Sequence, residues 1–123
     1  MSLESDLKTS LQANSTLTAV VGTRTEAGPL RHQQTLPAVT WHVITRTFEQ
    51  AANRAVKGTL TAIQFDVWAA TPAGIVAAAE ALKTAILAFT TSTHSLTIDA
   101  EYDVPEPIDS GVFHRAITCS ILT

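Results

Sequence analysis

The sequence predicts an α+β fold: an antiparallel-rich four-stranded sheet with helices packed on one face and a long protruding β-hairpin. Two alternating runs of apolar and polar residues, 39–48 and 59–70, flank a charged loop and predict a pair of long strands. An alanine-rich amphipathic helix follows them, and two more alternating runs end the chain. The predicted order is therefore helix, short helix, strand, strand, helix, strand, strand, which is typical of helices layered on one sheet.

The composition is that of one ordinary globular domain covering residues 1–123. Hydrophobic residues make up 46% of the chain and charged residues 15%, with only five glycines and five prolines. A chain of this length buries roughly two thirds of its unfolded surface, which is enough to fold without a metal ion or a disulfide. The single cysteine, Cys119, excludes an intramolecular disulfide.

Charge and hydropathy restrict the partners that this chain can bind. It has 8 basic and 11 acidic residues, a net charge of −3, and its basic residues are scattered. It therefore lacks the positive field that drives nucleic-acid binding, and we expect no sequence-specific nucleic-acid contact. No apolar run approaches the roughly 18 residues of a membrane span, and the first residues show no signal-peptide pattern. We expect a soluble, non-exported protein with no membrane partner.

The first two predicted elements are helices. Leucines recur at every fourth position over residues 3–13, which predicts an amphipathic helix. Ser15 is expected to cap a short second helix that Gly22 ends. Residues 23–36 show no periodicity, so we expect an irregular surface connection. A loop this long in so small a domain is a candidate functional or mobile segment.

The predicted hairpin is longer than a compact core can cover. Pro37 biases Leu36 toward an extended conformation and so opens the first strand. At about 3.3 Å per residue, each strand spans about 30 to 40 Å, against about 17 to 20 Å for an ordinary strand. Part of the hairpin must therefore protrude, and a protruding hairpin is either solvated or buried against another chain.

A third helix is expected after the hairpin. Thr71 provides a hydroxyl cap, and Pro72 occupies the first helical position, where its missing N–H costs nothing. Apolar residues then recur on one helical face, which predicts packing against the sheet. These residues are Ile75, Ala78, Ala79, Leu82, Ile86 and Phe89.

Two further strands are expected near the C-terminus, over residues 96–104 and 112–122. In the first, apolar residues alternate with Asp99, Glu101 and Asp103, which predicts one buried face and one acidic face. The expected buried residues of the two strands are Leu96, Ile98, Ala100, Tyr102, Val104, Phe113, Ile117, Cys119 and Ile121.

The residue pattern predicts no catalytic or cofactor site. The four histidines lack the spacing of a zinc site, and the isolated glycines form no phosphate-binding loop. Cys119 alternates with apolar residues, which favours a place in the core over a role as a nucleophile. Trp41 and Trp68 are expected to pack across the hairpin, since basic residues that would accompany base stacking do not surround them.

The acidic strand is also not expected to hold a metal ion. Asp99, Glu101 and Asp103 imitate the first three ligands of a calcium loop. The glycine and the final glutamate of such a loop are replaced here by Val104 and Ser110. A solvated strand face, or one that faces arginine side chains of a partner, accounts better for the acidic run.

Five features occur in a recognisable order along the chain. They are Leu36-Pro37-Ala38-Val39, Gln64-Phe65-Asp66-Val67-Trp68-Ala69, the alanine-rich helix, Glu101 with Pro105, and Gly111-Val112-Phe113-His114-Arg115. In this order and spacing they resemble the small tail-completion or tail-terminator proteins of long-tailed bacteriophages and prophages. The resemblance covers nearly the whole chain.

The resemblance implies an assembly role without catalysis. Such proteins form a ring, commonly hexameric, that caps the tail tube, stops its polymerisation and offers a surface for head-tail joining. The implied partners are other copies of the chain, the tail tube protein and the head-tail connector protein. The implied location is the virion tail, assembled in the cytoplasm of the bacterial host.

Two surfaces are candidates for these contacts. The projecting hairpin tip would meet an adjacent subunit or the tail tube, and the acidic strand would face the ring lumen or a charged interface. The tip residues are Glu49, Gln50, Asn53, Arg54 and Lys57, and the acidic residues are Asp99, Glu101 and Asp103. A surface that is acidic overall also suits a conduit through which DNA slides without binding.

Two other classes of function remain open. A regulatory module of ferredoxin-like shape would bind a small ligand between helix and sheet or at a dimer interface. A small isomerase or hydrolase would need titratable groups that converge, and none converge in the sequence. We rank the assembly protein first, the ligand-binding module second and the enzyme last.

Overall fold

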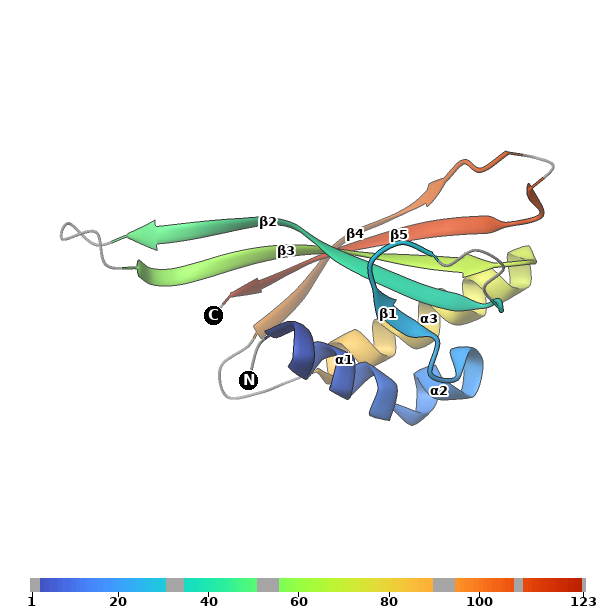
Figure 1. Cartoon of the computed structure of the whole chain (residues 1–123), viewed down its shortest axis with the longest axis horizontal. Helices are drawn as coiled ribbons and strands as arrows, with labels where there is room; N and C mark the ends of the chain where they lie inside the picture. The colour runs from blue at the N-terminus through green and yellow to red at the C-terminus, as the bar shows by residue number, and fades with distance from the viewer. Residues whose placement is uncertain (1–2, 31–34, 51–55, 90–94, 108–109, 123) are drawn as a thin grey trace.

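The computed structural model describes residues 3–30, 35–50, 56–89, 95–107 and 110–122. Three helices and five strands lie within these ranges (Figure 1). In chain order they are α1 (Leu3–Ala13), α2 (Ser15–Val21), β1 (Thr25–Ala27), β2 (Ala38–Gln50), β3 (Val56–Ala69), α3 (Pro72–Ala88), β4 (Ser95–Val104) and β5 (Phe113–Leu122). Within the described ranges, none of these helices has both the length and the apolar character needed to cross a membrane.

The strands form one sheet in the order β1-β2-β3-β5-β4. β1 runs parallel to β2, and every other neighbouring pair is antiparallel. The predicted α+β class and the antiparallel character of the sheet are confirmed. The predicted number of four strands is wrong, because the described residues form five.

The additional strand, β1, lies in the segment that was expected to be irregular. Three residues are too few to show alternation, so the local sequence carries no signal for this strand. Long-range hydrogen bonds hold it instead. The Gly28 amide donates to the Trp41 carbonyl at 2.9 Å, and the Val39 amide donates to the Arg24 carbonyl at 2.9 Å. Thr25, the first residue of β1, is fully buried.

The three helices lie on one side of the sheet, with α3 running along it (Figure 1). The hydrophobic core fills the space between these two layers. Two of its aromatic rings, Trp41 on β2 and Phe65 on β3, have centroids 6.4 Å apart and planes tilted by 41°. Burial of each large apolar side chain stabilises the fold by about 1.5 to 3 kcal/mol. Such side chains include Leu7, Leu11, Leu17, Ile63, Leu82, Ile86, Ile117 and Ile121.

Side-chain caps begin the second and third helices. Thr71 Oγ1 accepts a hydrogen bond from the Gly74 amide at 2.9 Å, so the predicted cap of α3 is confirmed. At α2 the cap is Asn14, and the expectation of Ser15 is wrong. Asn14 has an extended backbone and accepts from the Leu17 amide at 3.1 Å, whereas Ser15 is already helical.

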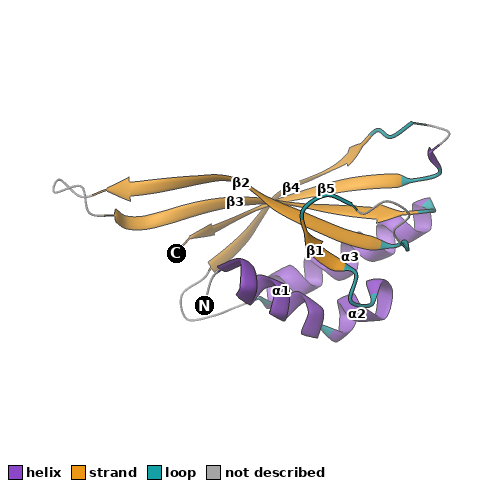
Figure 2. Ribbon diagram, viewed as in Figure 1, coloured by secondary structure: helices purple, strands orange, loops and turns teal. Residues whose placement is uncertain are grey.

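β2 and β3 form the long hairpin that the sequence predicts, with 13 and 14 residues. Figures 1 and 2 show it extending well past the helices and the other strands. An irregularity in its pairing lies between Val43 and Thr45. Three large apolar side chains on the hairpin, Ile44, Phe48 and Leu60, are 46%, 55% and 45% exposed. The hairpin therefore carries apolar surface that its own subunit does not cover.

β4 departs from the alternation that the sequence predicts. Its pairing with β5 is interrupted between Ile98 and Ala100 by one extra residue. One inserted residue reverses the side of the sheet on which the following side chains lie. Tyr102, which was expected to be buried, is 46% exposed, and Ala100 is exposed as well. The predicted buried face of this strand is therefore wrong beyond Ile98.

Candidate functional site

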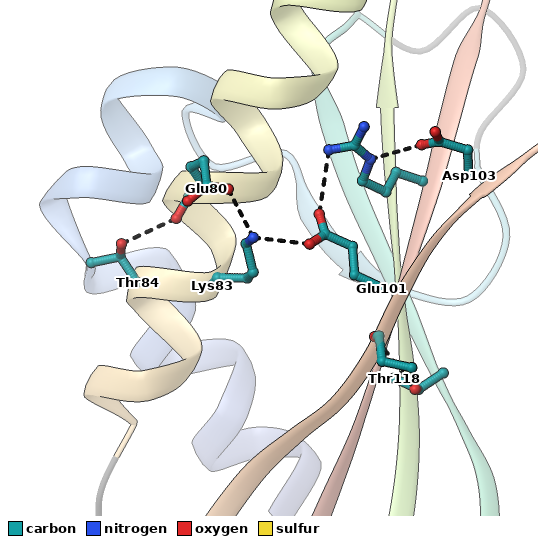
Figure 3. Close-up of polar contacts among 8 residues, drawn as sticks. Glu80, Lys83, Thr84, Glu101, Asp103 and Thr118 are labelled. Carbon is teal, nitrogen blue, oxygen red and sulfur yellow. Dashed lines mark hydrogen bonds and ion pairs between the residues drawn. The ribbon is translucent and has the colours of Figure 1, made fainter.

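Two acidic residues of β4 belong to an ion-pair network with α3 and β5 (Figure 3). The Lys83 ammonium lies 2.9 Å from a carboxylate oxygen of Glu101 and 2.8 Å from one of Glu80. Arg115 donates from Nε to Asp103 at 2.8 Å and from Nη1 to Glu101 at 3.3 Å. Glu101 therefore faces two cations of its own subunit, and the network ties the helix to the sheet.

The network also favours the charged form of its two cations. Hydrogen bonds to Glu80 and then to Glu101 raise the pKa of Lys83, and the hydrogen bond to Asp103 raises the pKa of Arg115. Both cations stay charged at neutral pH and offset much of the charge of the acidic strand. Asp103 is the more accessible of the two strand carboxylates, with 73% of its side chain exposed against 26% for Glu101.

Asp99, the third acidic residue of the strand, is directed differently. Its carboxylate accepts a hydrogen bond from the Ser120 hydroxyl. Ser120 alternates along β5 with the buried Cys119 and Ile121, so it lies on the sheet face away from the helices. The extra residue in β4 accounts for this change of side. The expected single acidic face is therefore wrong, while a role of these residues at a lumen or interface stays a prediction.

The candidate residues of the hairpin tip lie at the far end of β2 and β3. Glu49 and Gln50 end β2, and Lys57 is the second residue of β3. Asn53 and Arg54 lie outside the described residues. The structure thus places three of the five positions at the projecting end, and their role in contacts with other proteins stays a prediction.

A polar cluster that the sequence analysis missed lies on the sheet face away from the helices. His114 Nε2 lies 2.7 Å from Asp66 Oδ1, and His114 Nδ1 lies 2.8 Å from Glu106 Oε1. The side chains of His114 and Asp66 are each only 9% exposed. The Trp68 ring stacks on the imidazole with centroids 3.8 Å apart, and its indole N–H donates to Thr40 Oγ1 at 3.0 Å.

This cluster is best explained as a structural connection between strands. Through these two contacts, His114 joins β5 to Asp66 on β3 and to Glu106 after β4. Among the described residues, no group of three or more histidine, cysteine or acidic side chains is arranged to hold a metal ion.

An apolar groove of about 600 Å³ lies between the start of α3 and the adjoining end of β4 and β5. Val76, on α3, is 49% exposed at this groove. Phe113 was expected to be buried but is 44% exposed, because it is the first residue of β5 and borders the open groove. We define the apolar groove by Pro72, Ile75, Val76, Pro105, Val112 and Phe113.

Comparison with known proteins is informative at the level of the fold. No family model matches this sequence. No curated protein matches it either. Twenty-eight chains of solved structures match, among them one described as "Virion of native gene transfer agent (GTA) particle". That chain is 17% identical, with a TM-score of 0.59, and the match covers 98% of this chain and 91% of that chain. The likeness shows a shared fold over nearly the whole length.

Proposed function

We propose that this protein is a structural component of a phage-like virion, with the role of a tail-completion or tail-terminator protein. The observation that supports this proposal most is the fold shared over 98% of the chain with a chain of a gene transfer agent virion. The ordered motifs of the sequence, from Leu36-Pro37 to the segment ending at Arg115, support the same role. The proposed role is assembly, without a catalytic step.

In this role, copies of the chain form a ring, commonly hexameric, that caps the tail tube and offers a surface to the head-tail connector. A contact between two different surfaces closes into a ring when its rotation divides a full turn. The hairpin is suited to such a contact, since it leaves the core with Ile44 and Phe48 exposed. The proposed location is the virion tail, after assembly in the cytoplasm of a bacterial host.

Passage of DNA through the ring is compatible with the charge of the chain. A net charge of −3 gives little attraction for phosphate groups. Two of its cations, Lys83 and Arg115, are paired with carboxylates of the same subunit. A lumen of this kind would let DNA slide with little retention.

Deletion of the gene from the parent phage or prophage tests the proposal. We expect overlong tails or tails without heads, and complementation with the intact gene should restore normal particles. Electron microscopy of tail tubes mixed with the purified protein should show rings at tube ends. The tube can act as a template, so these mixtures are compared with the protein alone. Normal particles from the deletion strain would refute the proposed function.

The apolar groove supports one alternative, a regulatory module that binds a small ligand. Its volume of about 600 Å³ is within the range of small-molecule sites. A thermal-shift screen of metabolites would detect binding as a rise in melting temperature. Reproducible stabilisation by a metabolite, together with normal particles from the deletion strain, would favour the ligand-binding module.

A further inference from the structure

We propose that the contact between Glu106 and His114 is a latch that keeps the apolar groove open, and that its release lets a strap close over Val76 and Phe113. The strap comprises residues 105–107, directly after β4. The strap and the first residues of α3 both line the groove, at the end of the molecule away from the hairpin tip (Figure 1). The inference concerns the isolated chain, so it goes beyond the proposed function and does not depend on it.

The strap is a short irregular segment with few means of bonding to the sheet. β4 ends at Val104, and residues 105–107 belong to no helix or strand. Pro105 and Pro107 have no amide hydrogen, so neither donates a backbone hydrogen bond. Both prolines are exposed, whereas Glu106 between them is partly buried. The Glu106 side chain is therefore the part of the strap that turns toward the sheet.

His114 is the residue that receives this side chain. Glu106 Oε1 lies 2.8 Å from His114 Nδ1, and the other ring nitrogen lies 2.7 Å from Asp66 Oδ1. The Trp68 ring, stacked on the imidazole, restrains it from a third direction. Among the described residues, this is the one side-chain hydrogen bond or ion pair that joins the strap to a strand. The strap is thus fastened at a single point, whose receiving side is fixed within the sheet.

The latch keeps the strap away from α3. His114 and Asp66 lie on the sheet face away from the helices, whereas α3 packs on the opposite face (Figure 1). With Glu106 held there, Val76 is 49% exposed and Phe113 is 44% exposed at the groove. Removal of apolar surface from water is favourable, and the two prolines of the strap can supply the covering atoms. A strap that is no longer fastened should therefore move toward α3 and cover these side chains.

Gly111 provides a position at which the connection can bend. Its φ is +69°, in the region that glycine adopts readily. A Cβ atom placed on Gly111 would meet nothing within 4 Å, so its surroundings leave room for a change of dihedral angles. Hinge movements are absorbed by a few loop positions of this kind.

Alkylation of a cysteine in the groove tests the latch. Val76→Cys places a thiol where the strap would close, and Glu106→Ala removes the carboxylate. The native Cys119 is fully buried and should not compete, since burial raises the pKa of its thiol to about 12. Leu87→Cys is the matched control, because Leu87 lies near the other end of α3 and is 64% exposed. We expect E106A to slow the labelling of V76C by iodoacetamide about 3-fold or more, because only the open fraction reacts, and to leave the labelling of L87C unchanged.

Labelling of V76C that is unchanged or faster in E106A would overturn the inference, and so would a slowing that L87C shares. A second measurement detects closure directly, through disulfide formation between V76C and Pro107→Cys in one chain. We expect E106A to speed this reaction about 3-fold or more, because the strap then spends more time against α3. Disulfide formation at the same rate with and without E106A would overturn the closure.

Discussion

Cys119 lies in β5 with no exposed surface, and burial raises the pKa of its thiol to about 12, with the charge of Asp99 adding to the effect. Only the thiolate reacts readily, so the native protein should resist iodoacetamide at pH 8, while the unfolded chain reacts. Mass spectrometry of samples treated with and without urea checks this expectation. Fast labelling of the native protein would show that β5 opens more often than its burial implies.

The same thiol predicts how stability depends on pH. Its ordinary pKa is 9.0, and in the fold it is about 12. As pH rises above 9, the unfolded chain loses a proton that the folded chain keeps, so the free energy of unfolding should fall. Urea unfolding at pH 8 and pH 10 measures the loss. Cys119→Ala should show a smaller loss over this interval, and an equal loss would assign the effect to other groups.

Asp66 is a second residue whose surroundings predict a measurable effect. Its carboxylate accepts hydrogen bonds from Gln64 at 2.9 Å and faces His114 at 2.7 Å. Asp66→Ala removes the carboxylate from both partners, of which the His114 side chain is only 9% exposed, so we expect a loss of about 1 to 3 kcal/mol in the free energy of unfolding. His42→Ala is the control, because His42 lies 3.8 Å from Asp66 and its side chain is 52% exposed. Equal effects of the two variants would refute this account.

At the scale of elements, the contact between Lys83 and Glu101 joins α3 to β4. A double-mutant cycle with Lys83→Met and Glu101→Gln should give a coupling of about 0.2 to 1 kcal/mol, since both side chains touch solvent. The coupling should shrink in high salt. It should be complete below the ordinary lysine pKa of 10.5 and be lost at higher pH, because the fold raises that pKa. A coupling free energy that does not change with salt concentration would contradict the ion-pair explanation.

The acidic strand gives a test of assembly at the same scale. Asp103 is the clearest position, because 73% of its side chain is exposed and it forms an ion pair with Arg115. Asp103→Lys should weaken ring or tail association while changing the free energy of unfolding by no more than about 1 kcal/mol. Glu80→Lys, on α3 and 65% exposed at its side chain, is the control. If D103K associates as well as the unchanged protein, the acidic residues of β4 are better explained as a solvent-exposed surface with no part in assembly.

At the scale of the whole molecule, the core and the projecting hairpin are separable. The large buried apolar side chains that β2 and β3 contribute to the core are Val39, Trp41, Ile63, Phe65 and Val67, which lie in the part of the hairpin nearest its base. Deletion of residues 50–56 should therefore leave a folded monomer and abolish association with other copies or with the tail. Circular dichroism and urea unfolding report the fold, and electron microscopy with tail tubes reports association. Replacing residues 50–56 with a glycine-serine segment of equal length separates the effect of losing the side chains from the effect of shortening the hairpin.

The fold likeness to a virion chain also belongs to this scale. It extends over 98% of this chain at 17% identity, so it is carried by the arrangement of elements and not by shared residues. In the proposed function, this arrangement presents the projecting hairpin for contact with a neighbouring subunit or with the tail tube.

Short-range patterns in the sequence were sufficient to predict α3 and the hairpin. The cap at Thr71, the apolar stripe from Ile75 to Phe89 and the alternation of β2 and β3 all involve residues that are neighbours along the chain. Patterns of this kind are local, so they can be recognised without knowledge of the fold. They also predicted correctly that the hairpin is too long for the core to cover.

The sequence by itself therefore determined the α+β class, the order of the long elements and the projecting hairpin. Only the tertiary structure decided the three-residue strand β1, the change of face within β4 and the pairing of Asp66 with His114, which are 48 positions apart. The apolar groove likewise depends on how α3 meets the end of β4 and β5. Strand register and surface coverage arise from contacts between distant parts of the chain, and these contacts leave no periodic signal in the sequence.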